Sequence, residues 1–183
     1  MTGYVLDCCT LLNLYCGWGG LRELADFAES FHVGKAAEGE ILYTFEFQPD
    51  GTPFRKSLSV ADLRNEYPLA RLEMNSQEEM DLMVRLAERL GDGEAEGIAL
   101  AAARQMIFCS DDKPVAETIR ATGLNVRLIS TPELLQLWAS DDPCRLERMP
   151  NIVHRITVLG RFTPRSSNPH VTWWRAQLDK LVA

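Results

Sequence analysis

The segment that decides the fold is Tyr4-Val-Leu-Asp7, followed directly by Cys8-Cys-Thr-Leu-Leu-Asn-Leu14. A short apolar run that ends at an acid is typical of a buried strand. The segment from Cys8 to Leu14 predicts a short apolar helix. Another apolar run, Met106-Ile-Phe-Cys109, is also followed by acids, Asp111 and Asp112. Residues just beyond the carboxyl ends of parallel strands converge on one crevice in an open α/β sheet. We therefore expect Asp7 to lie near the acids that follow Cys109.

Strand-like and helix-like segments alternate along most of the chain. Capping signals such as Ser76-Gln-Glu-Glu79 and Thr131-Pro-Glu133 mark helix starts between short apolar runs. This order predicts a three-layer α/β/α fold with a mainly parallel central sheet. A helix is expected from Lys35 to about Leu42, with Glu40 on it.

Two segments depart from the alternation. Residues 43–60 alternate in strand fashion around the turn signal Pro49-Asp-Gly51, which predicts a hairpin inserted into the domain. Beyond residue 140 the pattern weakens, and helices are expected near residues 146–159 and 171–181. We therefore expect a domain over residues 1–140, with the insert at about 43–60, and a helical C-terminal extension over residues 141–183.

Composition narrows the class of protein. The 183 residues are 46% hydrophobic and 25% charged, which is typical of one globular domain, and the net charge of −7 argues against a broadly basic nucleic-acid-binding surface. Five cysteines without metal-binding spacing indicate reduced thiols and a cytoplasmic protein. There is no apolar run long enough for a membrane span and no secretion signal, so a membrane partner is not expected.

Acids at strand ends and helix starts suggest a cation site. Carboxylates brought together repel one another, and Mg²⁺ or Mn²⁺ with its preference for oxygen ligands relieves that repulsion. Such a site would suit phosphate chemistry, because one or two ions can activate water and neutralise phosphate oxygens. Each acid taken singly is more simply a turn residue, a helix cap or a solvated side chain.

Four segments together resemble the motifs of PIN-domain nucleases. These are Tyr4 to Leu14 with Asp7, His32 to Ile41 with Glu40, Gly93 to Ala103 with Glu94 and Glu96, and Phe108 to Lys113 with the two aspartates. The resemblance extends over residues 3–139 in order, spacing and setting. Cys8 and Cys9 stand where that family usually has Thr, Ser or Asn.

The resemblance implies a metal-dependent endoribonuclease that hydrolyses RNA, similar to the VapC toxins of toxin–antitoxin pairs. The implied catalytic residues are Asp7, Glu40, Glu96 and Asp112, and the implied Mg²⁺ or Mn²⁺ ligands are Asp7, Glu96, Asp112 and Asp111. Glu96 is preferred to Glu94 because Ile98 and Ala99 would then pack inward. Phosphate contacts are expected from Lys113, Ser110, Arg161 and Arg165. An antitoxin protein and a homodimer are the implied protein partners.

Three other interpretations of these acids are open. A phosphatase or dehalogenase could use Asp7 as a nucleophile, but such enzymes typically place a second aspartate two residues later, where Cys9 stands. A receiver-like domain needs paired acids after its first strand and a later lysine, whereas the pair Asp111 and Asp112 follows a late strand. A PIN-like domain without catalytic activity could act as a binding module, and Cys8 and Cys9 favour that alternative. Trp173, Trp174 and the basic residues of the tail could bind RNA or pack onto the domain.

Overall fold

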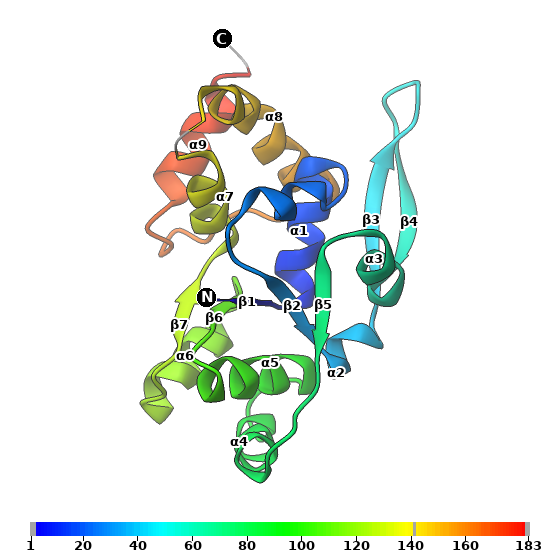
Figure 1. Ribbon diagram of the computed structural model, residues 1–183. Helices are drawn as coiled ribbons and strands as arrows, with labels where there is room; N and C mark the ends of the chain where they lie inside the picture. The colour runs from blue at the N-terminus through cyan, green and yellow to red at the C-terminus, as the bar shows by residue number, and fades with distance from the viewer. Residues whose placement is uncertain (1–2, 141, 182–183) are drawn as a thin grey trace.

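A parallel sheet forms the centre of the computed structural model, which describes residues 3–140 and 142–181. Its strands lie in the order β5-β2-β1-β6-β7, and every neighbouring pair is parallel (Figure 1). Their bounds are β1 Tyr4–Leu6, β2 Phe31–Gly34, β5 Leu69–Leu72, β6 Ile107–Cys109 and β7 Arg127–Ile129. The predicted parallel α/β architecture is therefore confirmed.

Helices connect the strands and cover the sheet. They are α1 Cys8–Trp18, α2 Lys35–Glu38, α3 Val60–Glu66, α4 Gln77–Ala87, α5 Asp92–Ala103, α6 Lys113–Thr122, α7 Thr131–Ala139, α8 Pro143–Leu159 and α9 Val171–Asp179, with a short 3-10 turn at Arg22–Asp26. Among residues 3–140 and 142–181, no helix is long and apolar enough to cross a membrane.

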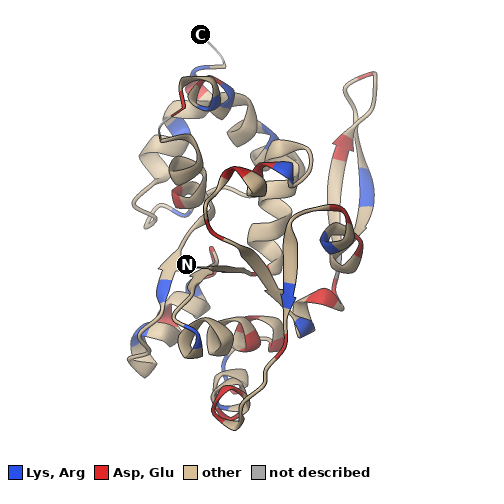
Figure 2. Cartoon of the chain, in the orientation of Figure 1, with Lys and Arg blue, Asp and Glu red and all other residues tan. Residues whose placement is uncertain are grey.

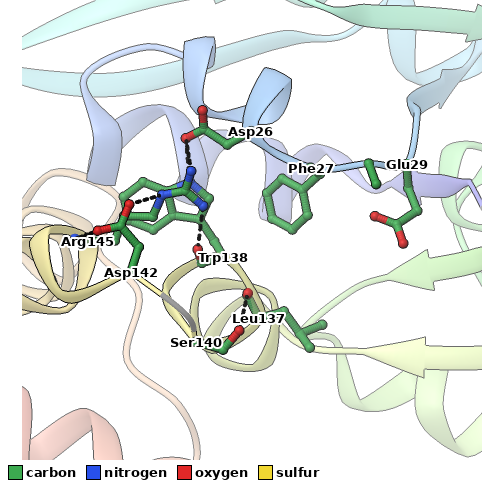
Figure 3. Close-up of a pocket in the computed structure, with 9 residues that line it drawn as sticks. Asp26, Phe27, Glu29, Leu137, Trp138, Ser140, Asp142 and Arg145 are labelled. Atoms are coloured by element: carbon green, nitrogen blue, oxygen red, sulfur yellow. Dashed lines mark hydrogen bonds and ion pairs between the residues drawn. The ribbon is translucent and has the colours of Figure 1, made fainter.

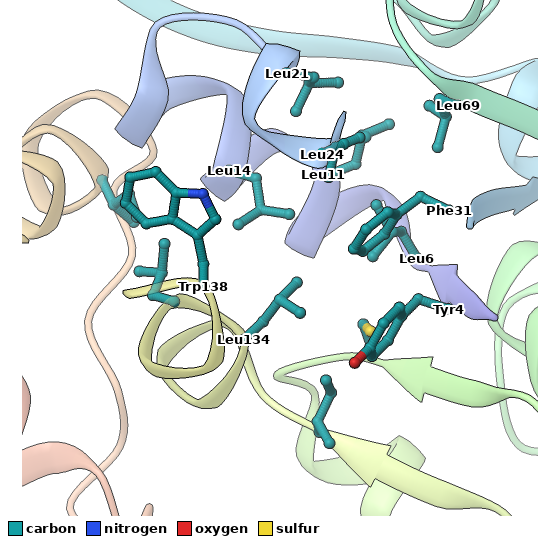
Figure 4. Packing of buried hydrophobic residues seen from close by; sticks show 14 of the residues in the cluster. Tyr4, Leu6, Leu11, Leu14, Leu21, Leu24, Phe31, Leu69, Leu134 and Trp138 are labelled. Atoms are coloured by element: carbon teal, nitrogen blue, oxygen red, sulfur yellow. The ribbon is translucent and has the colours of Figure 1, made fainter. Parts of the chain in front are cut away.

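Two hydrophobic cores lie on opposite faces of the sheet. Successive side chains of a strand point to opposite faces, and in β1 Tyr4 and Leu6 belong to one core whereas Val5 belongs to the other. Figure 4 shows part of the larger core, to which the sheet contributes Tyr4, Leu6 and Phe31, α1 contributes Leu11 and Leu14, and α7 contributes Leu134 and Trp138. Helices α4, α5 and α6 supply the smaller core. Helices therefore pack against both faces of the sheet.

The order in which strands are added to the sheet changes direction at β1. Strand β2 lies on one side of β1 and β6 on the other, and Leu6 is in register with Cys109. Asp7 and Ser110 therefore follow neighbouring strands at a topological switch point, where ligands bind in open α/β sheets. The expected proximity of Asp7 to the acids after β6 is thus built into the sheet.

The predicted hairpin is present, but the helix expected before it is shorter. Strands β3 (Ile41–Phe47) and β4 (Pro53–Ser59) form a separate antiparallel sheet, whereas α2 ends at Glu38. The expectation of a helix to about Leu42 is wrong, because Gly39 ends the helix and Leu42 and Thr44 are buried at alternate positions of a strand. Glu40 consequently lies in the link between α2 and β3.

The C-terminal helices share the main core. Met149, Ile152 and Ile156 of α8 are buried in the same cluster as β1 and α1. A Cβ atom on Gly17 would lie 2.9 Å from atoms of Ile152 and Ile156, so this glycine lets α8 approach α1 closely. Trp174 of α9 is fully buried and its Nε1 donates to Thr157 Oγ1 at 3.2 Å. Packing, one of the two roles considered for this tryptophan, is what the structure contains.

Replacing Ile156 with alanine tests whether α8 belongs to the core. Loss of a fully buried isoleucine side chain leaves a cavity, so we expect the free energy of unfolding to fall by about 2–5 kcal/mol in urea titrations. Val158→Ala on the same helix is the control, because Val158 is 37% exposed and its truncation should cost less than about 1 kcal/mol. Equal small losses in both variants would contradict this packing.

Candidate functional site

The two carboxylate oxygens of Asp7 differ in their hydrogen bonding. Its Oδ1 atom accepts the backbone N–H of Thr10 at 2.6 Å and thereby caps α1. Its side chain is buried, and Oδ2 has no hydrogen-bond partner among the described residues. Buried carboxylate oxygens normally have partners, because leaving one unpaired costs free energy. Oδ2 therefore has acceptor capacity left for a ligand, with the Ser110 hydroxyl as a polar neighbour of the carboxyl.

The environment of Asp7 disfavours its charge. Burial raises the pKa of this carboxyl from 3.8 to about 7, and the neighbouring charge of Asp111 adds to the rise, although interactions with Ser110 and Thr10 oppose it. Desolvation is the dominant cause, as expected of an acid removed from water. A bound cation would favour the charged form and return the pKa towards its ordinary range.

Asp111 is tied to the start of α7. It accepts the Thr131 backbone N–H at 3.1 Å and the Thr131 hydroxyl, and Asn13 Nδ2 lies 3.5 Å from Oδ2. Burial nevertheless raises the pKa of Asp111 to about 6. These contacts join α1, β6 and α7 around the candidate site. Asn13 and Thr131 were not predicted from the sequence, although Asn13 is a polar residue within the apolar run of α1.

Five acids lie near Cys8 and Cys9. The charges of Asp7, Asp111, Asp112 and Glu94 act on the Cys9 thiol, and Glu40 acts on Cys8. We call these five acids, Asp7, Glu40, Glu94, Asp111 and Asp112, the acid cluster. Burial first, and then these charges, raise the pKa of Cys9 to about 12 and raise that of Cys8 as well. Both thiols therefore stay protonated, which argues against a cysteine nucleophile.

Glu94 and Glu96 point to different neighbours. The carboxylate of Glu94 lies beside Asp112 and Glu40. Burial and the charges of these two acids raise the pKa of Glu94. Glu96 is buried instead at the carboxyl end of β2, where it accepts the Ala36 N–H at 2.7 Å and lies against Gly34. Figure 2 shows acidic positions of α5 beside α2. Glu94 therefore lies beside Asp112 and Glu40, whereas Glu96 contacts the start of α2.

The four residues expected to contact phosphate are differently placed. Ser110 is buried, and its hydroxyl accepts the Asp112 N–H at 3.2 Å. Lys113 forms an exposed ion pair with Glu117 at 3.0 Å. The Arg161 guanidinium lies over the Phe45 ring at 4.3 Å, and Arg165 is exposed in the segment between α8 and α9. The structure therefore brings only Ser110 of these four into contact with the acid cluster.

Several basic residues of the tail already have partners. Arg145 lies beside Trp138 and forms ion pairs with Asp26 and Asp142, at the rim of a cavity of about 410 Å³ (Figure 3). Arg148 pairs with Glu23, and Arg155 donates to the Cys16 carbonyl. A second cavity of about 590 Å³ lies among α7, α8 and α9. The residues that line these two cavities include no member of the acid cluster.

The oxygen donors of the acid cluster suit Mg²⁺ or Mn²⁺, which are bound by carboxylates in proteins. The unpartnered Oδ2 of Asp7 is the atom that best matches such an ion. Within residues 3–140 and 142–181, no three His, Cys, Asp or Glu side chains are gathered closely enough to hold one ion as they stand. The acid cluster therefore offers the oxygen donors that such an ion prefers, but its acids are spread around the two cysteines.

Replacing Asp7 with asparagine tests the cost of its buried charge. The pKa of Asp7 is raised in the folded state, so the folded protein binds the proton more tightly and loses stability as pH rises from about 4 to 7. In urea unfolding with a chelator, Asp7→Asn should be more stable than the wild type at pH 8, by on the order of 2–4 kcal/mol. The difference should vanish near pH 4.

Asp142→Asn is the matched control for that experiment. Asp142 also caps a helix, accepting the Cys144 N–H at 2.8 Å, but its side chain is 41% exposed. Asparagine caps helices about as well as aspartate, so this variant should gain no stability at pH 8. A comparable gain in both variants, or a gain for Asp7→Asn that persists at pH 4, would contradict a buried charge at Asp7.

A comparison of Glu94→Gln with Glu96→Gln separates the two glutamates. Glu96→Gln removes a charged acceptor from the Ala36 N–H, so its melting temperature should fall with and without Mn²⁺. Glu94→Gln relieves repulsion, so its melting temperature without metal should be unchanged or higher, while the rise on adding Mn²⁺ becomes smaller. The reverse pattern in these thermal melts would make Glu96 the ligand.

Comparisons with known proteins add no assignment. No family model matches the chain, and neither a curated protein nor a solved structure matches it. The resemblance to PIN-domain nucleases thus rests on the four sequence motifs, and a functional proposal rests on these motifs together with the geometry of the acid cluster.

Proposed function

We propose that this protein is a metal-dependent endoribonuclease with a PIN-like domain. The observation that carries the proposal is the buried carboxylate of Asp7 at a topological switch point with further acids nearby. Its Oδ2 has no hydrogen-bond partner in the part of the chain that the structure describes. A purely structural helix cap would not need a second, unsatisfied oxygen in a buried position. A divalent cation is the simplest partner for such an oxygen among acids.

The residues of the acid cluster would divide the work. Asp7, Asp112 and Glu94 would hold Mg²⁺ or Mn²⁺, which supplies an activated water and charge relief on the phosphate when bound. Asp111 and Ser110 would position this set, because they fix the start of α7 and the Asp112 backbone. Glu96 would position α2, and through it Glu40, by accepting the Ala36 N–H.

Proton release would accompany ion binding. With a pKa of about 7, the Asp7 carboxyl is partly protonated at neutral pH, and it must lose that proton to bind a cation. Metal affinity should therefore increase with pH through the range 6–8. The raised thiol pKa values of Cys8 and Cys9 leave these groups as neutral neighbours, not as competing ligands.

RNA is the proposed substrate because the motifs resemble those of PIN-domain ribonucleases. The same resemblance supports a toxin of a toxin–antitoxin pair, with an antitoxin protein and a homodimer as partners and a cytoplasmic location. A second candidate function is a binding module without catalysis. It is favoured by the spread of the acids, since no three of the described metal-ligating side chains converge on one point.

Cleavage of single-stranded RNA tests the proposal. Purified protein should cleave a labelled RNA when Mn²⁺ or Mg²⁺ is present and not when EDTA is present, as read on denaturing gels. Asp7→Asn and Asp112→Asn should each lower the rate by at least about 100-fold, the scale set by losing one preorganised electrostatic contact. Both variants should remain folded, because Asp7→Asn keeps the cap of α1 and the Asp112 side chain makes no capping hydrogen bond to α6.

Asp142→Asn, remote in its contacts from the acid cluster, is the control and should cleave at the wild-type rate. Metal-independent cleavage that survives Asp7→Asn would indicate a contaminating nuclease and defeat the proposal. Binding of RNA without cleavage under any metal condition would support the binding module instead.

A further inference from the structure

The β3–β4 hairpin has one packed face and one open face. Leu42, Thr44 and Leu58 are buried, and β3 packs against α1 and α8. Because strand side chains alternate, Tyr43, Phe45 and Phe47 project from the opposite face, where Tyr43 is 50% and Phe47 39% exposed. Figure 1 shows the hairpin extending beyond the helices beside it. Three aromatic rings thus follow one another on an open surface of β3.

Two arginines accompany these rings. The Arg55 guanidinium lies 3.8 Å from the centre of the Tyr43 ring, and that of Arg161 lies 4.3 Å from the centre of the Phe45 ring. Neither arginine forms an ion pair within the part of the chain that the structure describes. On the packed face, by contrast, Lys56 is neutralised by Glu46 at 2.7 Å.

The pairing register separates the charges of the two faces. Tyr43, Phe45 and Phe47 lie opposite Ser57, Arg55 and Pro53, so the open face contains no acid. Glu46 belongs to the packed side, and Asp50 at the tip is bound to Thr52. In a chain of net charge −7, this face is a local surface of positive charge and exposed rings. Its chemistry is complementary to a polyanion with flat bases.

We propose that the open face of the hairpin, formed by Tyr43, Phe45, Phe47, Arg55 and Arg161, binds single-stranded RNA and leads it to the acid cluster. The proposal rests on the proposed function. Aromatic rings on alternate strand positions, about 6.6 Å apart, offer successive bases a stacking surface, and arginines supply phosphate contacts. Paired RNA would bind less well, because its bases are already stacked on one another.

The connection of the hairpin to the site supports this path. Strand β3 begins directly after Glu40. The Glu40 carboxylate is close enough to Cys8 and Glu94 for its charge to raise the pKa of both groups. Glu40 Oε1 also lies 3.0 Å from the position of a Cβ atom on Gly93, at the start of α5. The base of the hairpin therefore adjoins the acid cluster. A strand of RNA along β3 would reach the acids at that end.

Fluorescence anisotropy with a labelled 12-nucleotide oligouridine, in EDTA to prevent cleavage, tests the proposal. Tyr43→Ala and Phe47→Ala should each weaken binding by roughly 5- to 100-fold, the effect of removing one stacking ring. Arg55→Gln should reduce the slope of log affinity against log salt by about 0.7, the value for one phosphate contact on a single strand. A duplex of the same length should bind more weakly than the single strand.

The packed face provides matched controls. Phe54→Ala removes a ring that is also 39% exposed but has the register of the packed side, and Lys56→Gln removes a cation already paired with Glu46. Neither should change affinity by more than about twofold. Equal effects of Phe47→Ala and Phe54→Ala, or wild-type affinity in all open-face variants, would overturn the proposal. Unchanged RNA affinity with a changed oligomeric state would make this face a protein interface and also overturn it.

Cleavage assays on the same variants separate this proposal from the proposed function. If the wild type cleaves RNA and the open-face variants bind normally, the hairpin proposal fails and the nuclease stands. If binding depends on the open face and no metal supports cleavage, the hairpin proposal stands and the nuclease fails.

Discussion

The structure depends on one constraint, the burial of a carboxylate at the carboxyl end of the central strand. Asp7 cannot move into solvent without giving up the cap of α1, and α1 is fixed by its packing against the sheet and α8. Parallel pairing of β1 with β6 then places Ser110, Asp111 and Asp112 beside it. The acids are close because the fold requires it. Burial is the main cost of the charges of Asp7 and Asp111, and the repulsion between neighbouring acids adds to it.

The hydrogen bonds that offset this cost are distributed unevenly among the acids. Asp111 receives hydrogen bonds from Thr131 and Asn13, so most of its capacity as an acceptor is used within the protein. Asp7 keeps one oxygen unpaired, and Glu94 lies among acids of the same sign. This division distinguishes acids that hold the framework from acids with capacity left for a ligand. Glu94 and Glu96 each accept one backbone N–H, from Gly91 and Ala36 respectively, so both also contribute to the framework.

The parallel sheet, the hairpin and most helices were predictable because they follow from local patterns: apolar runs, alternation and capping residues. The length of α2 was not, because Gly39 and the strand that follows it compete with a plausible helical pattern over the same residues. The different surroundings of Glu94 and Glu96 were also beyond a sequence argument. Two residues separated by two positions on a helix face different neighbours, and which neighbours these are depends on where α2 packs.

The membership of α8 in the main core depends likewise on contacts between residues far apart in the chain, such as Gly17 with Ile156. Asn13 and Thr131 meet Asp111 only through the tertiary fold. The sequence could therefore propose which residue types matter, but the partners of each residue required the three-dimensional structure.

The double role of Asp7 has a consequence for the evolution of this protein. Asparagine preserves the cap of α1 and removes a buried charge, so a single substitution at this position is tolerated by the fold. If the acids serve catalysis, inactive descendants that keep the whole architecture are easily reached, and stability gives no protection against them. Only selection for the chemistry itself would retain the acid over many generations.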